Sequence, residues 1–223
     1  MSATPTYSHT LADPRVATAL AGLFDAAARD EQTVSRLPAE PSALAALTAQ
    51  QLADAAQEIY MPVSADGGRL LYNLVRAARP ETVVEFGTSY GISTLHLAAA
   101  VRDNGTGRVV TTEMSRTKAA AARRTFAETG LDEAVTLLEG DALETLAALD
   151  GPVGFLFLDG WKDLCLPVLR LLEPRIAPGT LVVADDVVLP DLGPYLEYVR
   201  DDANGYHSVT FPVEDGMEIS CRL

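Results

Sequence analysis

The stretch TVVEFGTSYGIS, residues 82–93, decides the fold. It opens with an apolar run of strand length, and a helix is predicted over 91–102. Gly87 and Gly91 stand between them, where glycine lets the backbone approach a ligand and the helix N-terminus offers free N–H groups to an anion. The turn is not the dinucleotide motif G-x-G-x-x-G, because Ser89 and Ile92 interrupt the spacing. It predicts a strand–turn–helix unit that binds a ligand, although such glycines also occur for tight turns alone.

The same alternation continues toward the C-terminus. Strands are predicted at 108–113, 135–140, 153–158 and 180–184, and helices at 115–129, 142–149, 163–173 and 191–202. Apolar strands that alternate with helices indicate a parallel sheet covered on both faces. Segments 206–211 and 217–223 predict a closing antiparallel hairpin. In such sheets ligands bind at the carboxyl ends of the strands.

The N-terminal part predicts helices only. One runs from Pro14 to about Asp30, a second follows Pro41 to about Tyr60, and a third covers 69–78 after a loop at 61–68. We assign residues 1–60 to an N-terminal helical extension and residues 61–223 to the main domain.

Composition excludes several classes. The 223 residues are 48% hydrophobic, which suits a packed core, and the net charge of −14 disfavours binding nucleic acid through the overall field. Two cysteines, Cys165 and Cys221, are too few for a disulfide framework. The sequence shows neither a secretory signal pattern nor an apolar run of membrane length, so we expect a soluble, cytoplasmic protein without a membrane partner.

Polar residues end the second and third predicted strands. Glu113 can accept both hydroxyls of a ribose, and Asp141 can accept from an adenine amino group, although Asp141 alone also fits a helix N-cap. Ser93, in the first turn of its helix, can add a hydroxyl. Together with the glycine turn, these residues predict a bound adenosine.

Carboxylates end the fourth and fifth predicted strands. Asp159 ends one, and Asp185 and Asp186 end the other, so the three converge if the strands are neighbours. Like charges that close share protons or bind a cation, and carboxylate oxygens suit Mg²⁺ and tolerate Ca²⁺ or Mn²⁺. Lys162 can reach the same volume and act as a general base. The alternative to a cation site is that one of Asp185 and Asp186 caps the following segment and the other is solvated, with Lys162 as an ordinary solvated lysine.

Two blocks of the sequence resemble a known family. Residues 61–93, MPVSADGGRLLYNLVRAARPETVVEFGTSYGIS, and residues 155–167, FLFLDGWKDLCLP, followed by ADDVVLP (184–190), are similar to the metal-dependent class I S-adenosylmethionine-dependent O-methyltransferases. Catechol and caffeoyl-CoA O-methyltransferases typify this group, and the resemblance covers about residues 57–200. It implies a Rossmann-like, mostly parallel seven-stranded sheet with a C-terminal antiparallel hairpin. It also implies metal-assisted methyl transfer from S-adenosylmethionine to a hydroxyl of a small phenolic, catechol-like or secondary-metabolite acceptor.

The resemblance also implies a role for each site residue. Around the cofactor's methionine part it places Glu85, Gly87 and Ser93, with Met61 and Val63 in the loop that closes over it, and Asp159 nearby. Glu113 would bind the ribose, Asp141 and Ala142 would form the adenine-binding turn, and Trp161 would flank the adenine. Asp159, Asp185 and Asp186 would hold the metal, and Lys162 would remove the proton from the acceptor hydroxyl.

Four departures from the family pattern affect these roles. Asp186 stands where the family often has asparagine, which adds a potential negative charge. Ile59 stands where the family has a gatekeeper tryptophan that packs on the catechol ring. The hairpin 206–223 does not align clearly over the second partner of the acceptor hydroxyls, for which Glu214 is the candidate. The extension exceeds the matched region, and the resemblance implies that it covers the active site or forms a homodimer.

Other functions remain open at this point. A tRNA-modifying methyltransferase of the same fold is disfavoured by the net charge of −14. An NAD-dependent dehydrogenase lacks support without G-x-G-x-x-G, and a non-catalytic cofactor-binding protein leaves the Asp159–Lys162–Asp185 set unexplained. We therefore expect a small-molecule acceptor and no nucleic-acid partner.

Overall fold

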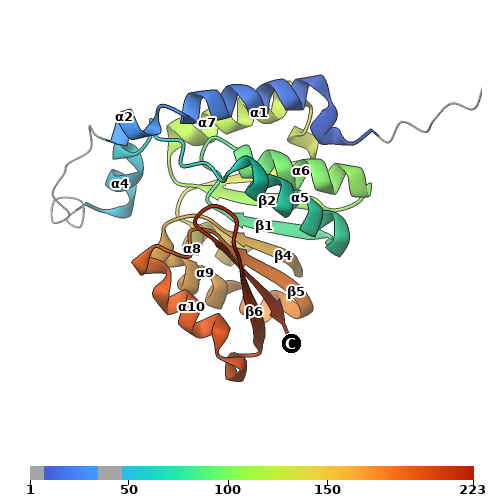
Figure 1. Ribbon diagram of the computed structural model, residues 1–223, viewed down its shortest axis with the longest axis vertical. Helices are drawn as coiled ribbons and strands as arrows, with labels where there is room; N and C mark the ends of the chain where they lie inside the picture. Colours follow the sequence, from blue (N-terminus) through green and yellow to red (C-terminus); the bar gives the residue numbers. More distant parts are fainter. Residues whose placement is uncertain (1–7, 35–46) are drawn as a thin grey trace, which may run out of the picture.

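The computed structural model describes residues 8–34 and 47–223, which contain a seven-stranded sheet of order β3-β2-β1-β4-β5-β7-β6 (Figure 1). The pairs β1–β2, β1–β4, β2–β3 and β4–β5 are parallel, and β7 pairs antiparallel with β5 and β6. The strands are β1 (Thr82–Phe86), β2 (Arg108–Glu113), β3 (Val135–Glu139), β4 (Val153–Leu158), β5 (Ile176–Ala184), β6 (Tyr206–Phe211) and β7 (Met217–Arg222). The predicted fold class is confirmed.

Helices cover both faces of this sheet, because successive side chains of a strand point to opposite faces. Val83 and Phe155 belong to one core, with α1, α5, α6 and α7, and Val84 and Leu156 belong to the other, with α8, α9 and α10. The helices described are α1 (Pro14–Ala27), α2 (Asp30–Val34), α4 (Ala49–Ala55), α5 (Ala65–Ala78), α6 (Ile92–Asn104), α7 (Arg116–Thr129), α8 (Ala142–Thr145), α9 (Cys165–Leu172) and α10 (Gly193–Arg200).

Helix α5 begins earlier than the sequence predicted. Ser64 caps it by accepting a hydrogen bond from Gly67 N at 3.0 Å. A Cβ on Gly67 would lie 2.6 Å from Val63 Cγ2, and one on Gly68 would lie 2.6 Å from the His96 ring. The two glycines therefore permit close packing inside the helix. The predicted loop at 61–68 was wrong in its second half.

Helix α4 ends at Ala55, before the predicted end near Tyr60. It begins after Thr48, which forms a reciprocal capping box with Gln51; the predicted start after Pro41 lies outside the described residues. The segment that follows leaves the helix and lies against the glycine turn, as described below. At the other end of the chain, β5 begins at Ile176, earlier than predicted.

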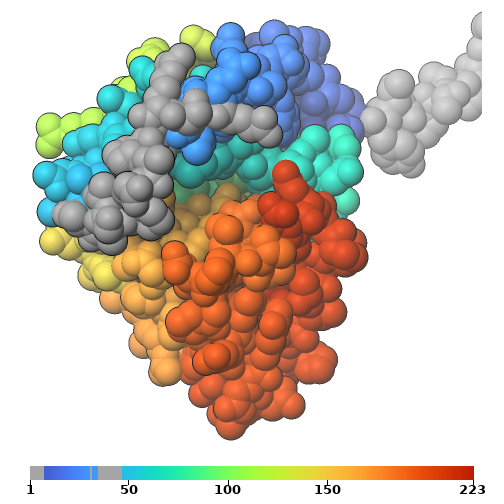
Figure 2. Space-filling view, turned by 60° about the vertical axis from the view of Figure 1, so that its left-hand side comes forward, coloured from blue at the N-terminus to red at the C-terminus, as the bar shows by residue number. Residues whose placement is uncertain are grey.

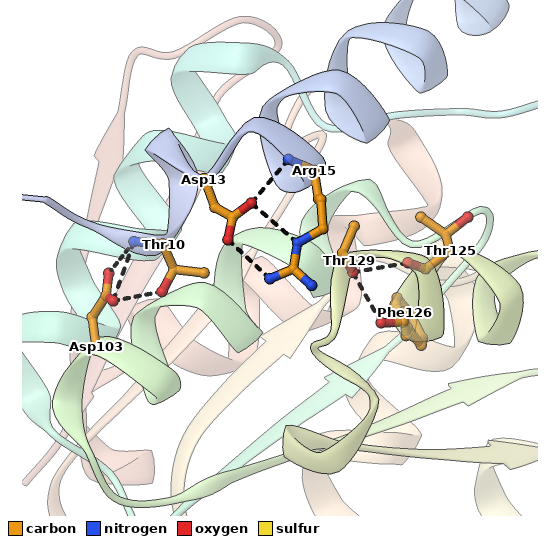
Figure 3. A network of polar contacts seen from close by, with 7 residues as sticks. All are labelled: Thr10, Asp13, Arg15, Asp103, Thr125, Phe126 and Thr129. Atoms are coloured by element: carbon orange, nitrogen blue, oxygen red, sulfur yellow. Dashed lines mark hydrogen bonds and ion pairs between the residues drawn. The ribbon is translucent and has the colours of Figure 1, made fainter.

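The start of the extension is fixed to the main domain (Figure 3). Thr10 donates to the Asp103 carboxylate from its N–H at 2.9 Å and from its hydroxyl at 2.6 Å. Asp13 caps α1 by accepting from Arg15 N at 2.9 Å. The Arg15 side chain extends toward the end of α7, at Thr129. Helix α1 thus lies along α6 and α7 (Figure 1).

Candidate active site

A cavity of about 420 Å³ lies at the carboxyl ends of the parallel strands. Figure 2 shows this face, where the blue-to-teal N-terminal part meets the orange C-terminal part. All the predicted site residues except Glu85 line the cavity: Met61, Val63, Gly87, Ser93, Glu113, Asp141, Ala142, Asp159, Trp161, Lys162, Asp185 and Asp186. Strands, turns and the segment before α5 therefore bring together residues more than a hundred positions apart.

The glycine turn is shaped by close contacts within the protein. Gly87 has φ +102°, and a Cβ there would lie 2.7 Å from the Asp159 carbonyl oxygen. Gly91 has φ +92°, and a Cβ there would lie 2.7 Å from the Phe126 ring. Packing thus accounts for both glycines. The predicted ligand-binding role of the turn is supported instead by its position in the cavity wall.

Glu113 is held by backbone donors from two turns. Its two carboxylate oxygens accept from Ser89 N and from Ser115 N, each at 2.7 Å. Burial raises the pKa of Glu113, and these N–H groups and the Lys118 ammonium oppose that effect. Because an ionised carboxylate offers about four acceptor positions, both oxygens can still accept from the hydroxyls of a ribose.

The predicted adenine-binding turn lies at the start of α8. Asp141 is the N-cap and accepts from Leu143 N at 2.8 Å, so its capping interpretation is confirmed. Ala142 is 4% exposed, and Trp161 faces the same cavity from just before the 3₁₀ turn Lys162–Leu164. These residues supply a carboxylate, a small apolar surface and an aromatic side chain to the cavity wall.

Glu85 lies behind the cavity wall and is fully buried. Its Oε2 accepts from the hydroxyls of Thr94 and Thr111 at 2.5 and 2.6 Å, whereas Oε1 has no hydrogen-bond partner among the described residues. Burial raises the pKa of Glu85 to about 7, against the opposing effect of neighbouring hydroxyls. Phe86 and Gly87, the next residues, line the cavity. Because Glu85 does not line the cavity and the Ser93 hydroxyl also acts on it, Glu85 supports the glycine turn from behind in this arrangement.

The carboxylates converge as the sequence predicted, because β4 and β5 are parallel neighbours. Lys162 Nζ lies 2.8 Å from Asp159 Oδ1 and 2.9 Å from Asp186 Oδ2. Asp185 is buried, and its Oδ1 accepts from Asp186 N at 3.0 Å. One ammonium therefore joins the ends of both strands.

Negative charge exceeds positive charge in this cluster. Burial, followed by the charges of Asp159 and Asp186, raises the pKa of Asp185 to about 8. Burial alone would lower the pKa of Lys162, but Asp159 and Asp186 outweigh it and raise that pKa above its usual value. Lys162 is thus a cation in this arrangement. Lys162 can act as the predicted general base only if another cation binds these carboxylates, because their charges otherwise keep it protonated.

The donor chemistry of the cluster fits a hard cation, since it offers carboxylate oxygens only. Within the described ranges, however, no three His, Cys, Asp or Glu side chains are already arranged around a metal position. In this arrangement the Lys162 ammonium forms ion pairs with both Asp159 and Asp186. Metal binding at Asp159, Asp185 and Asp186 stays a prediction.

Sequence reasoning missed Lys118. This lysine of α7 is 4% exposed, lines the cavity, and lies 5.9 Å from the centre of the Tyr90 ring. Burial lowers its pKa, and the charge of Glu113 opposes that effect. Its spacing from the buried Ala122 and Phe126 is helical, so periodicity could have placed it on the inner face of α7.

Ile59 and Glu214, which were named among the departures from the family pattern, differ in their position relative to the cavity. Ile59 is 3% exposed and does not contribute to the cavity wall, so it does not provide a ring-packing surface in this arrangement. Glu214 does line the cavity and has φ +51° in the β6–β7 turn. Its position is compatible with contact to an acceptor.

Comparison with known proteins agrees with this geometry. A family model described as a methyltransferase domain matches residues 84–187. The chain is 33% identical over 181 residues to catechol O-methyltransferase B of Danio rerio, covering 75% of this chain and 67% of that protein. It is 36% identical over 149 residues to a probable O-methyltransferase of Mycobacterium tuberculosis, covering 62% of this chain and 63% of that one.

The fold also matches a solved structure. The O-methyltransferase TomG of Streptomyces achromogenes, in complex with S-adenosylmethionine, superposes with a TM-score of 0.67 and 26% identity. The match covers 90% of this chain and 98% of that one. The chain thus spans nearly all of this structural neighbour and about two thirds of the two curated relatives.

Proposed function

The chain belongs to the class I S-adenosylmethionine-dependent O-methyltransferases, and on that premise we propose that it methylates a hydroxyl oxygen of a small acceptor. One observation carries the proposal: Glu113 and the Asp159–Lys162–Asp186 cluster face the same cavity. The first suits a ribose, and the second suits an oxygen that loses a proton. A cavity with both can hold methyl donor and acceptor side by side.

At the β1–β2 end the residues bind and orient the cofactor. S-adenosylmethionine supplies a methyl group on a positively charged sulfur, which makes that methyl electrophilic. Glu113 would accept from the ribose hydroxyls, and Ala142 and Trp161 would contact the adenine. Met61 and Val63 would cover the methionine part. The free acceptor positions of Glu113 support this assignment.

At the β4–β5 end the residues position the acceptor. Asp159, Asp185 and Asp186 would hold Mg²⁺, or Ca²⁺ or Mn²⁺, and such a cation lowers the pKa of an acceptor hydroxyl. Lys162, no longer neutralised by these carboxylates, would lose its proton and then accept one from that hydroxyl. Alignment of the two reactants within one cavity would supply much of the rate.

The rim favours an aromatic acceptor with neighbouring hydroxyls. Leu189 and Met61 are 43% and 47% exposed and line the cavity, and Glu214 adds an acceptor of hydrogen bonds. The catechol O-methyltransferases among the relatives support the same class. We therefore propose a vicinal-diol phenol as the acceptor.

No helix in the described ranges is long and apolar enough to cross a bilayer. The cytoplasmic location and the homodimer stay predictions.

The direct test supplies labelled S-adenosylmethionine and a panel of vicinal-diol phenols. We expect label transfer with Mg²⁺, none in EDTA, and none for Lys162→Ala. Full activity in EDTA would contradict the cation role, and full activity of the Lys162 variant would contradict the base. Salt-sensitive RNA binding, or calorimetric binding of NAD in preference to S-adenosylhomocysteine, would instead favour the other functions considered above.

A further inference from the structure

We propose that Asp30 is a positioning residue for cofactor binding: from the N-terminal extension, its carboxylate holds the segment 57–63 closed over the cavity. We call this segment the roof segment. Tyr60, Met61, Pro62 and Val63 all line the cavity from it. The inference rests on the proposed function, because it assigns the regulation of cofactor affinity to a residue outside the methyltransferase domain.

The carboxylate of Asp30 binds two successive backbone donors. Tyr60 N lies 2.9 Å from both of its oxygens, and Met61 N lies 2.8 Å from Oδ2. Met61 has φ +45°, a left-handed conformation that is unfavourable for a residue with a side chain. Successive N–H groups in such a turn form a concave site for an anion. Asp30 is that anion, and it stabilises a backbone shape that Met61 alone would not favour.

The roof segment is also joined to the glycine turn. The Tyr60 ring stacks on Tyr90 at 3.9 Å and 14°. Ser89 Oγ donates to the Tyr60 carbonyl at 2.6 Å, and Tyr90 Oη donates to the Gln57 carbonyl at 2.7 Å. Ser89 N is in turn a donor to Glu113. Direct contacts thus connect Asp30, through Tyr60 and Ser89, to the carboxylate proposed to bind the ribose.

The charges of the same two carboxylates act on a buried cation, Lys118. Lys118 lines the cavity beside Tyr90, and the charges of both Glu113 and Asp30 act on it. Removal of Asp30 would therefore change the shape of the roof segment and also remove one of the negative charges that act on Lys118. Both effects fall on the cofactor and neither falls on the β4–β5 carboxylates.

The extension is anchored well enough to transmit this constraint. Thr10 is fixed to Asp103 at the end of α6, and Val16 of α1 is fully buried. Asp30 follows α1 after a short turn and begins α2. The extension thus holds a carboxylate at a defined place, and Asp30 acts through the roof segment without lining the cavity itself.

The test compares Asp30→Ala and Asp30→Asn with Asp25→Ala, a control on the exposed surface of α1. Calorimetry measures the Kd of S-adenosylhomocysteine, and steady-state assays on the acceptor found in the screen above separate KM for S-adenosylmethionine from kcat. Hydrogen bonds to a charged group are worth about 1.5–3 kcal/mol, so Asp30→Ala should raise Kd and KM about 10–100-fold. Asp30→Asn should have a smaller effect, and kcat and the control should change by less than about two-fold.

Each outcome is decisive. Unchanged Kd in Asp30→Ala, or a fall in kcat at unchanged KM, would overturn the inference while leaving the proposed function intact. Wild-type protein that fails to bind S-adenosylhomocysteine would contradict the proposed function itself. If Asp30→Ala does not fold, Asp30→Asn decides: the ligand-induced rise of its melting temperature should be smaller than that of wild type, and an equal rise would overturn the inference.

Discussion

The carboxylates at the two ends of the cavity are stabilised by different kinds of partner: hydrogen-bond donors at one end and an ammonium at the other. At the β1–β2 end, Glu113 accepts two backbone N–H groups and Glu85 accepts two threonine hydroxyls. At the β4–β5 end, Asp159 and Asp186 share the single ammonium of Lys162. Asp185 beside them has a pKa raised to about 8 by burial and by their charges.

This difference separates two tasks. Dipolar donors from a rigid backbone stay in place when a ligand leaves, so the β1–β2 end is preorganised for a polar ligand such as a ribose. Three carboxylates around one lysine are short of positive charge, so the β4–β5 end gains stability from any further cation. We therefore expect the β1–β2 end to bind its ligand without a metal, and the β4–β5 end to require one.

The largest effect should come from removing the ammonium. Lys162→Met leaves Asp159 and Asp186 without their counter-ion, and breaking such a pair inside a protein costs about 3–5 kcal/mol. Protonation of the carboxylates would relieve part of this cost. We expect the free energy of unfolding, measured by urea denaturation, to fall by about 2–4 kcal/mol at pH 8 and by less at pH 6. Lys118→Met is the matched control; an equal loss in both variants would remove the distinction between the two ends.

A second, smaller effect should appear at the cofactor end. Glu113→Gln places an amide NH₂ against Ser89 N or Ser115 N, two donors that need an acceptor. We expect the Kd of S-adenosylhomocysteine to rise about 10–100-fold, with no change in cation binding. Glu139→Gln, at the end of β3, is the control. Loss of cation binding in Glu113→Gln would show that the two ends are not separate.

The pH dependence caused by Glu85 should change stability by less than the removal of the Lys162 ammonium. Its pKa is about 7 in the folded protein and near the usual 4.5 in the unfolded chain. Between these values the folded state binds more protons, so this group makes the free energy of unfolding fall as pH rises from about 5 to about 7. Glu85→Gln should remove this slope and raise stability at pH 8 by about 2–3 kcal/mol at most. Identical pH profiles of wild type and variant would contradict the assignment.

Local patterns predicted much of this site. Apolar runs that end at Glu113, Asp159 and Asp185 mark strand ends, and parallel strands bring such ends to one edge. Local patterns could not predict how segments distant in the sequence pack against each other. Gly67 and Gly68 were interpreted as a loop because their neighbours, Val63 and His96, are known only once α5 and α6 are in contact.

Local patterns also could not predict which charged side chains meet which partners. The contact of Asp30 with Tyr60 and Met61 joins residues 30 or 31 positions apart, and no periodicity predicts it. Lys162 was predicted to reach the carboxylates, and it does. The charged state of Lys162 depends on its burial and on the charges of Asp159, Asp185 and Asp186. The pattern of strand ends in the sequence does not carry this information.

Titration of Mg²⁺ into the protein loaded with S-adenosylhomocysteine, followed by calorimetry in buffers of different ionisation enthalpy, tests the central claim most directly. The claim is that the β4–β5 end is incomplete without a cation. We predict saturable binding at one site with release of protons from Asp185 and Lys162, and loss of that binding in Asp185→Asn. Absence of saturable binding in the wild-type protein, or undiminished binding in the Asp185 variant, would contradict it.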